Sequence, residues 1–258
     1  MKKKFAIYVE GQTEQILLSH LFKTWWNFTG IRIENIKLFR NVRKDLIIPN
    51  FPADSDYRQD ADFLFLIIDI QGVGALQSII TERAKRQHDQ GFEIIALRDL
   101  HAQDFEDYRT KEKRNFQTSE SIQNIAKVIE ANIKKAFKQL NCGDPNIVDL
   151  HFAIMDIEAW LLTFRTTLSK WAGISEEKVK ALISNDLTNM ENLNSEFIKN
   201  PNKIICQISE LGGKSYSKSF HTAQSLVSHI SREEINTVYQ SSRNSSFSKF
   251  WNKFSCLA

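Results

Sequence analysis

The sequence predicts an α/β protein in which a mostly parallel sheet is flanked by helices and followed by a helical C-terminal extension. Short apolar runs of strand length alternate with amphipathic stretches of helix length through the first two thirds of the chain, which is the pattern of βαβ units. The 258 residues include only 9 Gly and 4 Pro, which disfavours turn-dense all-β folds. After Trp171 the remaining apolar patterns have helical spacing.

The strands are expected where apolar residues form compact runs or alternate with polar ones. Residues 62–68 form the most apolar of these runs, which ends at Asp69. Such runs are typical of parallel strands that helices cover on both faces. The expected strands are residues 4–9, 32–39, 62–68, 92–97 and 148–155.

Helices are expected between and after these strands, because apolar residues recur there at a spacing of three or four. Residues 41–61 contain Pro49 and Pro52 and are expected to be irregular, and residues 101–118 form a polar, charge-rich loop. The expected helices cover residues 13–28, 73–88, 119–140, 176–183, 196–210, 222–230 and 246–254, and a further helix directly after residue 155 carries Asp156, Glu158, Trp160 and Leu161.

Length and composition limit the class of protein. With 42% hydrophobic residues, 18 Phe and 5 Trp, the chain can build a large core, which excludes global disorder. We expect a core of residues 1–165 and a helical region of residues 166–258, with a soft boundary. The 3 Cys lack CxxC spacing, so neither a disulfide framework nor a zinc site is expected, and the cytoplasm is the expected location. No apolar run approaches the roughly 18 residues of a membrane span, so no membrane partner is expected.

Acidic residues stand at the ends of four apolar runs. Glu10, Asp69 and Asp99 come at or just after the ends of the runs 4–9, 62–68 and 92–97. Asp156 and Glu158 follow the run 148–155. Because ligands bind at the carboxyl ends of parallel strands, which lie about 4.8 Å apart, these carboxylates are expected to reach one cation. A hard divalent cation such as Mg²⁺ takes oxygen ligands and would relieve the repulsion among them. The alternative is that each acid only caps the helix that follows it.

The end of the first expected strand resembles the first motif of TOPRIM domains, the metal-binding catalytic modules of topoisomerases, primases and OLD-type nucleases. The stretch that carries the resemblance is Tyr8-Val9-Glu10-Gly11-Gln12-Thr13-Glu14-Gln15. It implies that Glu10 serves as a metal-associated acid or general base. The second TOPRIM signature is a strand ending in Asp-x-Asp, but here Asp99 is followed two residues later by His101. Imidazole is a poorer Mg²⁺ ligand than carboxylate and suits Mn²⁺ better, so both Mg²⁺ and Mn²⁺ are open as the cofactor.

Two later stretches narrow the resemblance to a bacterial family of uncharacterised TOPRIM-like proteins. These stretches are residues 99–105 and 154–162, and the family is related to nuclease subunits that accompany ATPases in anti-phage systems. The resemblance covers roughly residues 4–165, and Tyr216-Ser217-Lys218 is similar to the same family more weakly. It implies a divalent-metal-dependent nuclease that cleaves DNA or RNA as a defence effector, with an ATPase subunit as a partner.

The resemblance also implies roles for individual residues. The implied catalytic residues are Glu10, Asp99 and His101. Asp99 is the main implied metal ligand, and Glu10, Asp104 and Glu158 are further candidate ligands. Asp69 is an additional candidate because it ends the adjacent expected strand. His101, Asp104 or Glu158 would complete the metal shell or orient water.

The distribution of basic residues keeps a nucleic-acid substrate open, although 34 Lys plus Arg against 31 Asp plus Glu gives a net charge of only +3. Residues 201–258 contain seven basic and three acidic residues, so this segment carries 7 − 3 = +4. A further basic loop follows Asp99. Cations beside a metal site can hold a phosphodiester backbone, while the alternative is ordinary solvated surface. The candidate nucleic-acid contacts are Arg109, Lys111, Lys113, Arg114, Lys214 and Lys218.

Other interpretations remain open. One is a non-catalytic TOPRIM-fold sensor or scaffold that binds an ATPase or nucleic acid. The presence of His101 in place of the second Asp of the Asp-x-Asp signature favours this interpretation. Another is a small-molecule phosphotransfer or nucleotide-processing enzyme, and homo-oligomerisation is open in every case. Residues 212–215, Gly-Gly-Lys-Ser, resemble the end of a Walker A loop, but Ile208 stands where that motif requires its first Gly.

Overall fold

The computed structural model describes most of the chain, and it confirms the α/β class. The described residues are 3–38, 45–47, 61–72, 76–100, 119–139, 144–185, 195–198, 200–241 and 243–257. A six-stranded sheet has the order β3-β2-β4-β1-β5-β6. Its strands are β1 (Lys3–Val9), β2 (Ile31–Leu38), β3 (Asp45–Ile47), β4 (Phe63–Asp69), β5 (Phe92–Leu100) and β6 (Val148–Ile154). All neighbouring strands pair in parallel except β3, which runs antiparallel to β2 at the edge.

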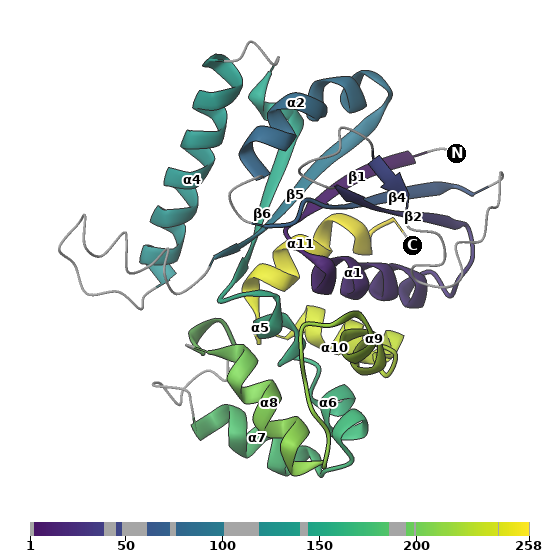
Figure 1. The fold of residues 1–258 in the computed structure, drawn as a ribbon, viewed down its shortest axis with the longest axis vertical. Helices are drawn as coiled ribbons and strands as arrows, with labels where there is room; N and C mark the ends of the chain where they lie inside the picture. The colour runs from purple at the N-terminus through teal and green to yellow at the C-terminus, as the bar shows by residue number, and fades with distance from the viewer. Residues whose placement is uncertain are drawn as a thin grey trace.

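Helices connect the strands and make up the C-terminal region (Figure 1). Those of the first part are α1 (Gln12–Trp25), α2 (Leu76–Asp89), α4 (Ser119–Gln139) and the 3-10 helix η2 (Pro145–Ile147). Those that follow β6 are α5 (Ile157–Leu161), α6 (Arg165–Ala172), α7 (Glu176–Asn185), η3 (Ser195–Phe197), α8 (Pro201–Leu211), α9 (Phe220–Val227), α10 (Arg232–Gln240) and α11 (Ser245–Ser255). Within the described residues, no helix has both the length and the apolar character needed to cross a membrane.

Several local features differ from the sequence prediction. The short strand β3 lies in a segment that is predicted to be irregular, and α6 and α10 have no counterpart among the predicted helices. The helix predicted to begin at residue 196 begins at Pro201, because the side chain of Asn200 accepts a hydrogen bond from the Lys203 N–H and Pro201 suits the first helical turn.

Each face of the sheet packs against its own set of helices. Side chains alternate along β1, so Phe5 and Ile7 join the larger hydrophobic cluster while Ala6 and Tyr8 join a smaller one. The smaller cluster includes apolar residues of α2 and α4, and the larger one includes residues of α1 and of the C-terminal helices. The two parts of the chain therefore share one core on the α1 face.

The last helix returns to the sheet and lies beside α1 (Figure 1). Phe22 of α1 stacks on Phe65 of β4 with a centroid distance of 4.2 Å, and on Trp251 of α11 at 5.7 Å. Phe254 of α11 meets Phe5 of β1 edge-to-face at 5.4 Å. Such aromatic contacts bury large apolar areas, so α11 forms part of the sheet's core.

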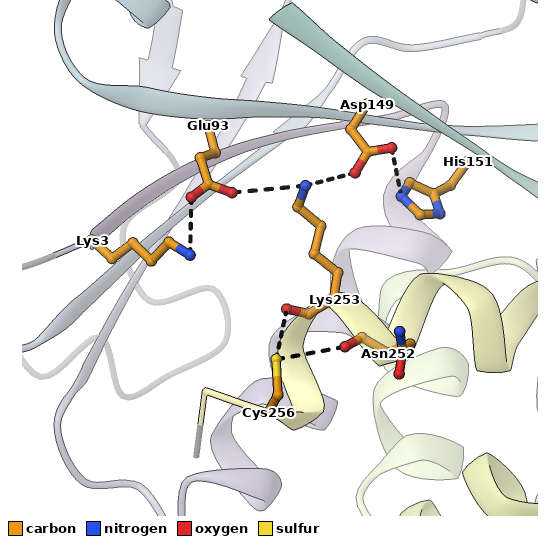
Figure 2. A network of polar contacts seen from close by, with 7 residues as sticks. All are labelled: Lys3, Glu93, Asp149, His151, Asn252, Lys253 and Cys256. Atoms are coloured by element: carbon orange, nitrogen blue, oxygen red, sulfur yellow. Dashed lines mark hydrogen bonds and ion pairs between the residues drawn. The ribbon is translucent and has the colours of Figure 1, made fainter.

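A polar network fastens α11 to the beginnings of three strands, at the edge opposite their carboxyl ends (Figure 2). Lys253 Nζ lies 2.6 Å from Asp149 Oδ2 and 3.7 Å from Glu93 Oε2, and Lys3 Nζ lies 3.0 Å from Glu93 Oε1. His151 Nε2 lies 3.2 Å from the other oxygen of Asp149. The hydrogen bond with His151, and then that with Lys253, hold the pKa of Asp149 well below its usual range.

The Gly-Gly-Lys-Ser stretch joins two helices of the C-terminal region and does not follow a strand, as a Walker A loop would. Gly212 caps the end of α8, where a Cβ atom at residue 212 would lie 1.9 Å from the carbonyl oxygen of Ala172 at the end of α6. The Lys214 ammonium donates to the carbonyl oxygen of Trp171 and lies 5.5 Å from the centroid of its ring. Gly212 and Lys214 therefore hold the ends of α6 and α8 together.

We predict that Gly212→Ala destabilises the protein, because the added methyl group meets backbone that cannot rotate away. The expected loss is about 2–3 kcal/mol of unfolding free energy, which for a chain of this size lowers the melting temperature by roughly 5–10 °C. Thermal unfolding followed by circular dichroism measures it. Ser215→Ala, at an exposed position of the same loop, is the control, and equal melting temperatures for the two variants would contradict the close approach.

Candidate functional site

The acidic residues at the strand ends lie along one edge of the sheet. In the order β4-β1-β5-β6 the four acid-bearing strands are consecutive and parallel. Asp69 ends β4, Glu10 follows β1, and Asp99 is the next-to-last residue of β5. Asp156 and Glu158 follow β6 at the start of α5. The parallel pairing brings these carboxyl ends to the same edge, as expected.

Five carboxylates at this edge influence one another, and we call them the acidic cluster: Glu10, Glu14, Asp99, Asp156 and Glu158. Burial raises the pKa of Asp99 well above its usual range, and the charges of Glu14, Glu10, Asp156 and Glu158 raise it further. Four members of the cluster are buried, with Asp99 only 5% exposed and Glu158 0% exposed, and Asp156 is half-buried. Among the described residues, Asp99 Oδ1 has no hydrogen-bond partner.

Glu14 joins the cluster from the first turn of α1. Its pKa is raised from 4.5 to about 7, mainly by burial and further by the charge of Glu158. A backbone hydrogen bond and the hydrogen bond with the Asp99 side chain act in the opposite direction and lower the pKa. At neutral pH Glu14 is therefore protonated in part of the molecules, whereas an exposed glutamate would have released its proton. Glu14 comes four residues after Glu10 in the sequence, and the groups that act on it include Asp99 of β5 and Glu158 of α5.

Cationic and phenolic groups contact the edge of the acidic cluster. Lys218 Nζ lies 2.9 Å from Glu158 Oε2, and the Tyr216 hydroxyl donates to Glu158 Oε1 at 3.2 Å. Arg98 Nε lies 3.8 Å from Glu10 Oε1. Burial lowers the pKa of Lys218, but the nearby carboxylates outweigh this effect, with Glu158 first, so that its pKa is raised overall. Lys218 is thus a charged partner of the cluster.

The backbone is strained where β6 leads into the cluster. Met155 and Asp156 have φ angles of 60° and 74°, a region that side-chain-bearing residues rarely adopt. Such residues cost of order 1–3 kcal/mol each and occur often at functional sites. The Met155 N–H donates to the carbonyl oxygen of Leu100 at 2.9 Å, which ties this turn to the end of β5. Glu158, which follows this turn, is one of the charges that raise the pKa of Asp99.

The other sequence-predicted residues lie apart from the cluster or outside the described residues. Asp69 is buried, and its carboxylate accepts a hydrogen bond of 2.8 Å from the Gln71 N–H. It is not among the largest influences on the pKa of Asp99. The Lys214 ammonium donates to the carbonyl oxygen of Trp171, where the ends of α6 and α8 meet. The residues outside the described ranges are His101, Asp104, Arg109, Lys111, Lys113 and Arg114.

Sequence reasoning assigns no role to Glu14 or Tyr216, which the structure places in the site, and it expects Asp156 at this edge without including it in the implied ligand set. Glu14 is visible as an acid in the first motif, four residues after Glu10. Tyr216 offers only a weak signal, because its contact with Glu158 spans 58 residues of chain. The helical C-terminal region thus contributes to a site that the sequence assigns mainly to residues 1–165.

The donor chemistry of the acidic cluster fits a hard divalent cation. All five members offer carboxylate oxygens, the ligands that Mg²⁺ and Mn²⁺ prefer. A divalent charge would also remove the repulsion that raises the pKa of Asp99. As the side chains stand, the described residues contain no group of three His, Cys, Asp or Glu placed to hold a metal ion. The ligand chemistry is therefore present, and the ligand geometry is not preformed within these residues.

Comparison with known proteins gives one match. The family model described as Domain of unknown function (DUF4276) matches residues 9–254, which include the whole acidic cluster, Tyr216 and Lys218. No curated protein and no solved structure matches the chain.

Proposed function

We propose that this chain, which belongs to the DUF4276 family, is a divalent-metal-dependent nuclease that cleaves phosphodiester bonds in DNA or RNA. The observation that carries the proposal is the acidic cluster: buried carboxylates from the ends of three adjacent parallel strands, with one more from α1. Burying this much negative charge is costly unless a cation or protons neutralise it. A structural role alone does not explain why the chain bears that cost beside a strained turn.

The roles of the residues follow from their positions. A bound Mg²⁺ or Mn²⁺ would polarise the phosphate and lower the pKa of a water molecule. Asp99, in the centre of the cluster, is the main proposed ligand, with Glu158 and Glu14 beside it. Glu10 is proposed to take the proton from the attacking water, while the bond between phosphorus and the leaving oxygen breaks and that oxygen takes up a proton. His101 and Asp104 remain proposed contributors.

The biological setting belongs to the same proposal. The motifs around Glu10, Asp99 and Glu158 support a cytoplasmic defence effector that works with an ATPase subunit, because they are the motifs that resemble such nucleases. The proposed nucleic-acid contacts are the basic loop after Asp99 together with Lys214 and Lys218 of the C-terminal region.

A cleavage assay on purified protein tests the proposal. Plasmid DNA, single-stranded DNA and structured RNA would be incubated with Mg²⁺, Mn²⁺ or EDTA, and we expect cleavage of a polymer with either metal and none with EDTA. Hydrolysis of mononucleotides but not of polymers would select the small-molecule enzyme. Nucleic-acid binding without any metal binding would select the scaffold, and either result would contradict the nuclease.

A further inference from the structure

The segment between α8 and α9 brings a tyrosine and a lysine to the acidic cluster. Tyr216 is buried and fixed: its ring meets that of Trp171 edge-to-face at 6.3 Å, and its carbonyl oxygen lies 3.9 Å from Cys206 Sγ. Its hydroxyl contacts one oxygen of Glu158, and Lys218 contacts the other. This segment therefore supplies a partner to each oxygen of a carboxylate that is 0% exposed.

Tyr216 and Lys218 differ in how firmly they are held. Tyr216 is 7% exposed and packed on several sides, whereas the Lys218 side chain is 46% exposed. The lysine reaches in from solvent on a long flexible stem, so its ammonium can leave without disturbing the packing. The residues from Lys214 to Lys218 are in neither a helix nor a strand.

The Lys218 ammonium acts on most of the cluster. Its charge interacts with Glu158, Asp156 and Asp99, and it also acts on Glu14. It thus provides part of the neutralisation that a divalent cation would provide. Two cations cannot share this small volume without strong repulsion, since the interaction between charges strengthens as the site becomes drier.

We propose that Lys218 is an internal counter-ion that neutralises the acidic cluster in the metal-free protein and is displaced when a divalent cation binds. Tyr216 stays in place and keeps Glu158 oriented, while the ammonium moves out to solvent. The segment that carries Lys218 thereby sets the metal concentration at which the site fills. This inference rests on the proposed function, because it assumes that the cluster takes up a divalent cation.

Titration calorimetry with Mn²⁺ tests the proposal on the full chain. Lys218→Met removes the competing charge, and we expect Mn²⁺ to bind at least about tenfold more tightly than to the wild type. Lys218→Arg keeps the charge and is expected to keep an affinity close to that of the wild type. Lys249→Met removes the same charge from an exposed position on α11 and is the matched control. Unchanged or weaker binding by a folded Lys218→Met variant would overturn the proposal.

Chemical modification of the wild type gives a second readout that does not depend on a variant. A trace of acetic anhydride would be added with and without saturating Mn²⁺, and acetylation of Lys218 and Lys249 compared by peptide mass spectrometry. We expect Mn²⁺ to increase acetylation of Lys218 several-fold relative to Lys249, and an unchanged ratio would overturn the displacement. If the wild type binds no metal, the proposed function fails; if it binds metal but Lys218 has neither effect, only this inference fails.

Discussion

Asp99→Asn and Glu10→Gln are each expected to lower metal-dependent nucleic-acid cleavage by roughly two to three orders of magnitude or more. Both substitutions keep the side-chain volume and remove one negative charge, from the main proposed ligand and from the proposed base. Cleavage rates on the best substrate, at matched protein and Mg²⁺ concentrations, measure the effect. Asp89→Asn, at an exposed position of α2, is the control and should keep wild-type activity.

The same Asp99→Asn variant is expected to be more stable than the wild type when no metal is present. Burial and the neighbouring acids disfavour the charged form of Asp99, so a neutral amide relieves a cost that the native site bears. Gain of stability with loss of activity is typical of functional sites. If the variant unfolds more easily than the wild type and also cleaves normally, Asp99 would be a structural residue.

The metal-free protein is expected to lose stability as the pH rises from about 5 to 8. The pKa of Glu14 is about 7 in the folded protein and 4.5 as its ordinary value. Between these two pH values the folded chain keeps a proton that the unfolded chain has released, so raising the pH favours unfolding. A difference of this size corresponds to about 3 kcal/mol for Glu14, and the raised pKa of Asp99 acts in the same direction.

Urea denaturation in EDTA at several pH values measures this effect. Glu14→Gln is expected to flatten the fall, while Glu177→Gln, at an exposed position of α7, should leave it as in the wild type. Mg²⁺ added at pH 8 is expected to restore stability, because it binds the ionised cluster of the folded state. A wild-type curve that is no steeper than that of Glu14→Gln would mean that Glu14 titrates normally.

The sequence predicts the parallel strands and the positions of the acids well, for a physical reason. Four of the strands, β4, β1, β5 and β6, lead into an acid, and their parallel pairing then brings Glu10, Asp99 and Glu158 to one edge. Those three positions follow from local patterns combined with one rule of sheet topology. The prediction that they bind metal is not tested by the fold.

Contacts that depend on how distant segments dock could not be predicted in this way. The ion pair between Lys218 and Glu158 depends on how the segment before α9 packs against α5, and no local spacing encodes that arrangement. Helix α10 is missed because only Ile235 and Val238 are buried on it, which gives too weak an apolar pattern. Glu14 is visible only as an acid in the first turn of α1, and nothing in the local sequence shows that Asp99 and Glu158 come close enough to act on it.

The most direct test of the acidic cluster as a metal site is calorimetric titration of Mg²⁺ and Mn²⁺ into the wild type at pH 7, in buffers of different ionisation enthalpy. We expect saturable binding that releases protons, because Glu14 and Asp99 must ionise before they can act as ligands. Asp99→Asn is expected to abolish the binding and the proton release together. Absence of binding by the wild type, or equal binding with equal proton release by Asp99→Asn, would contradict a metal site at the acidic cluster.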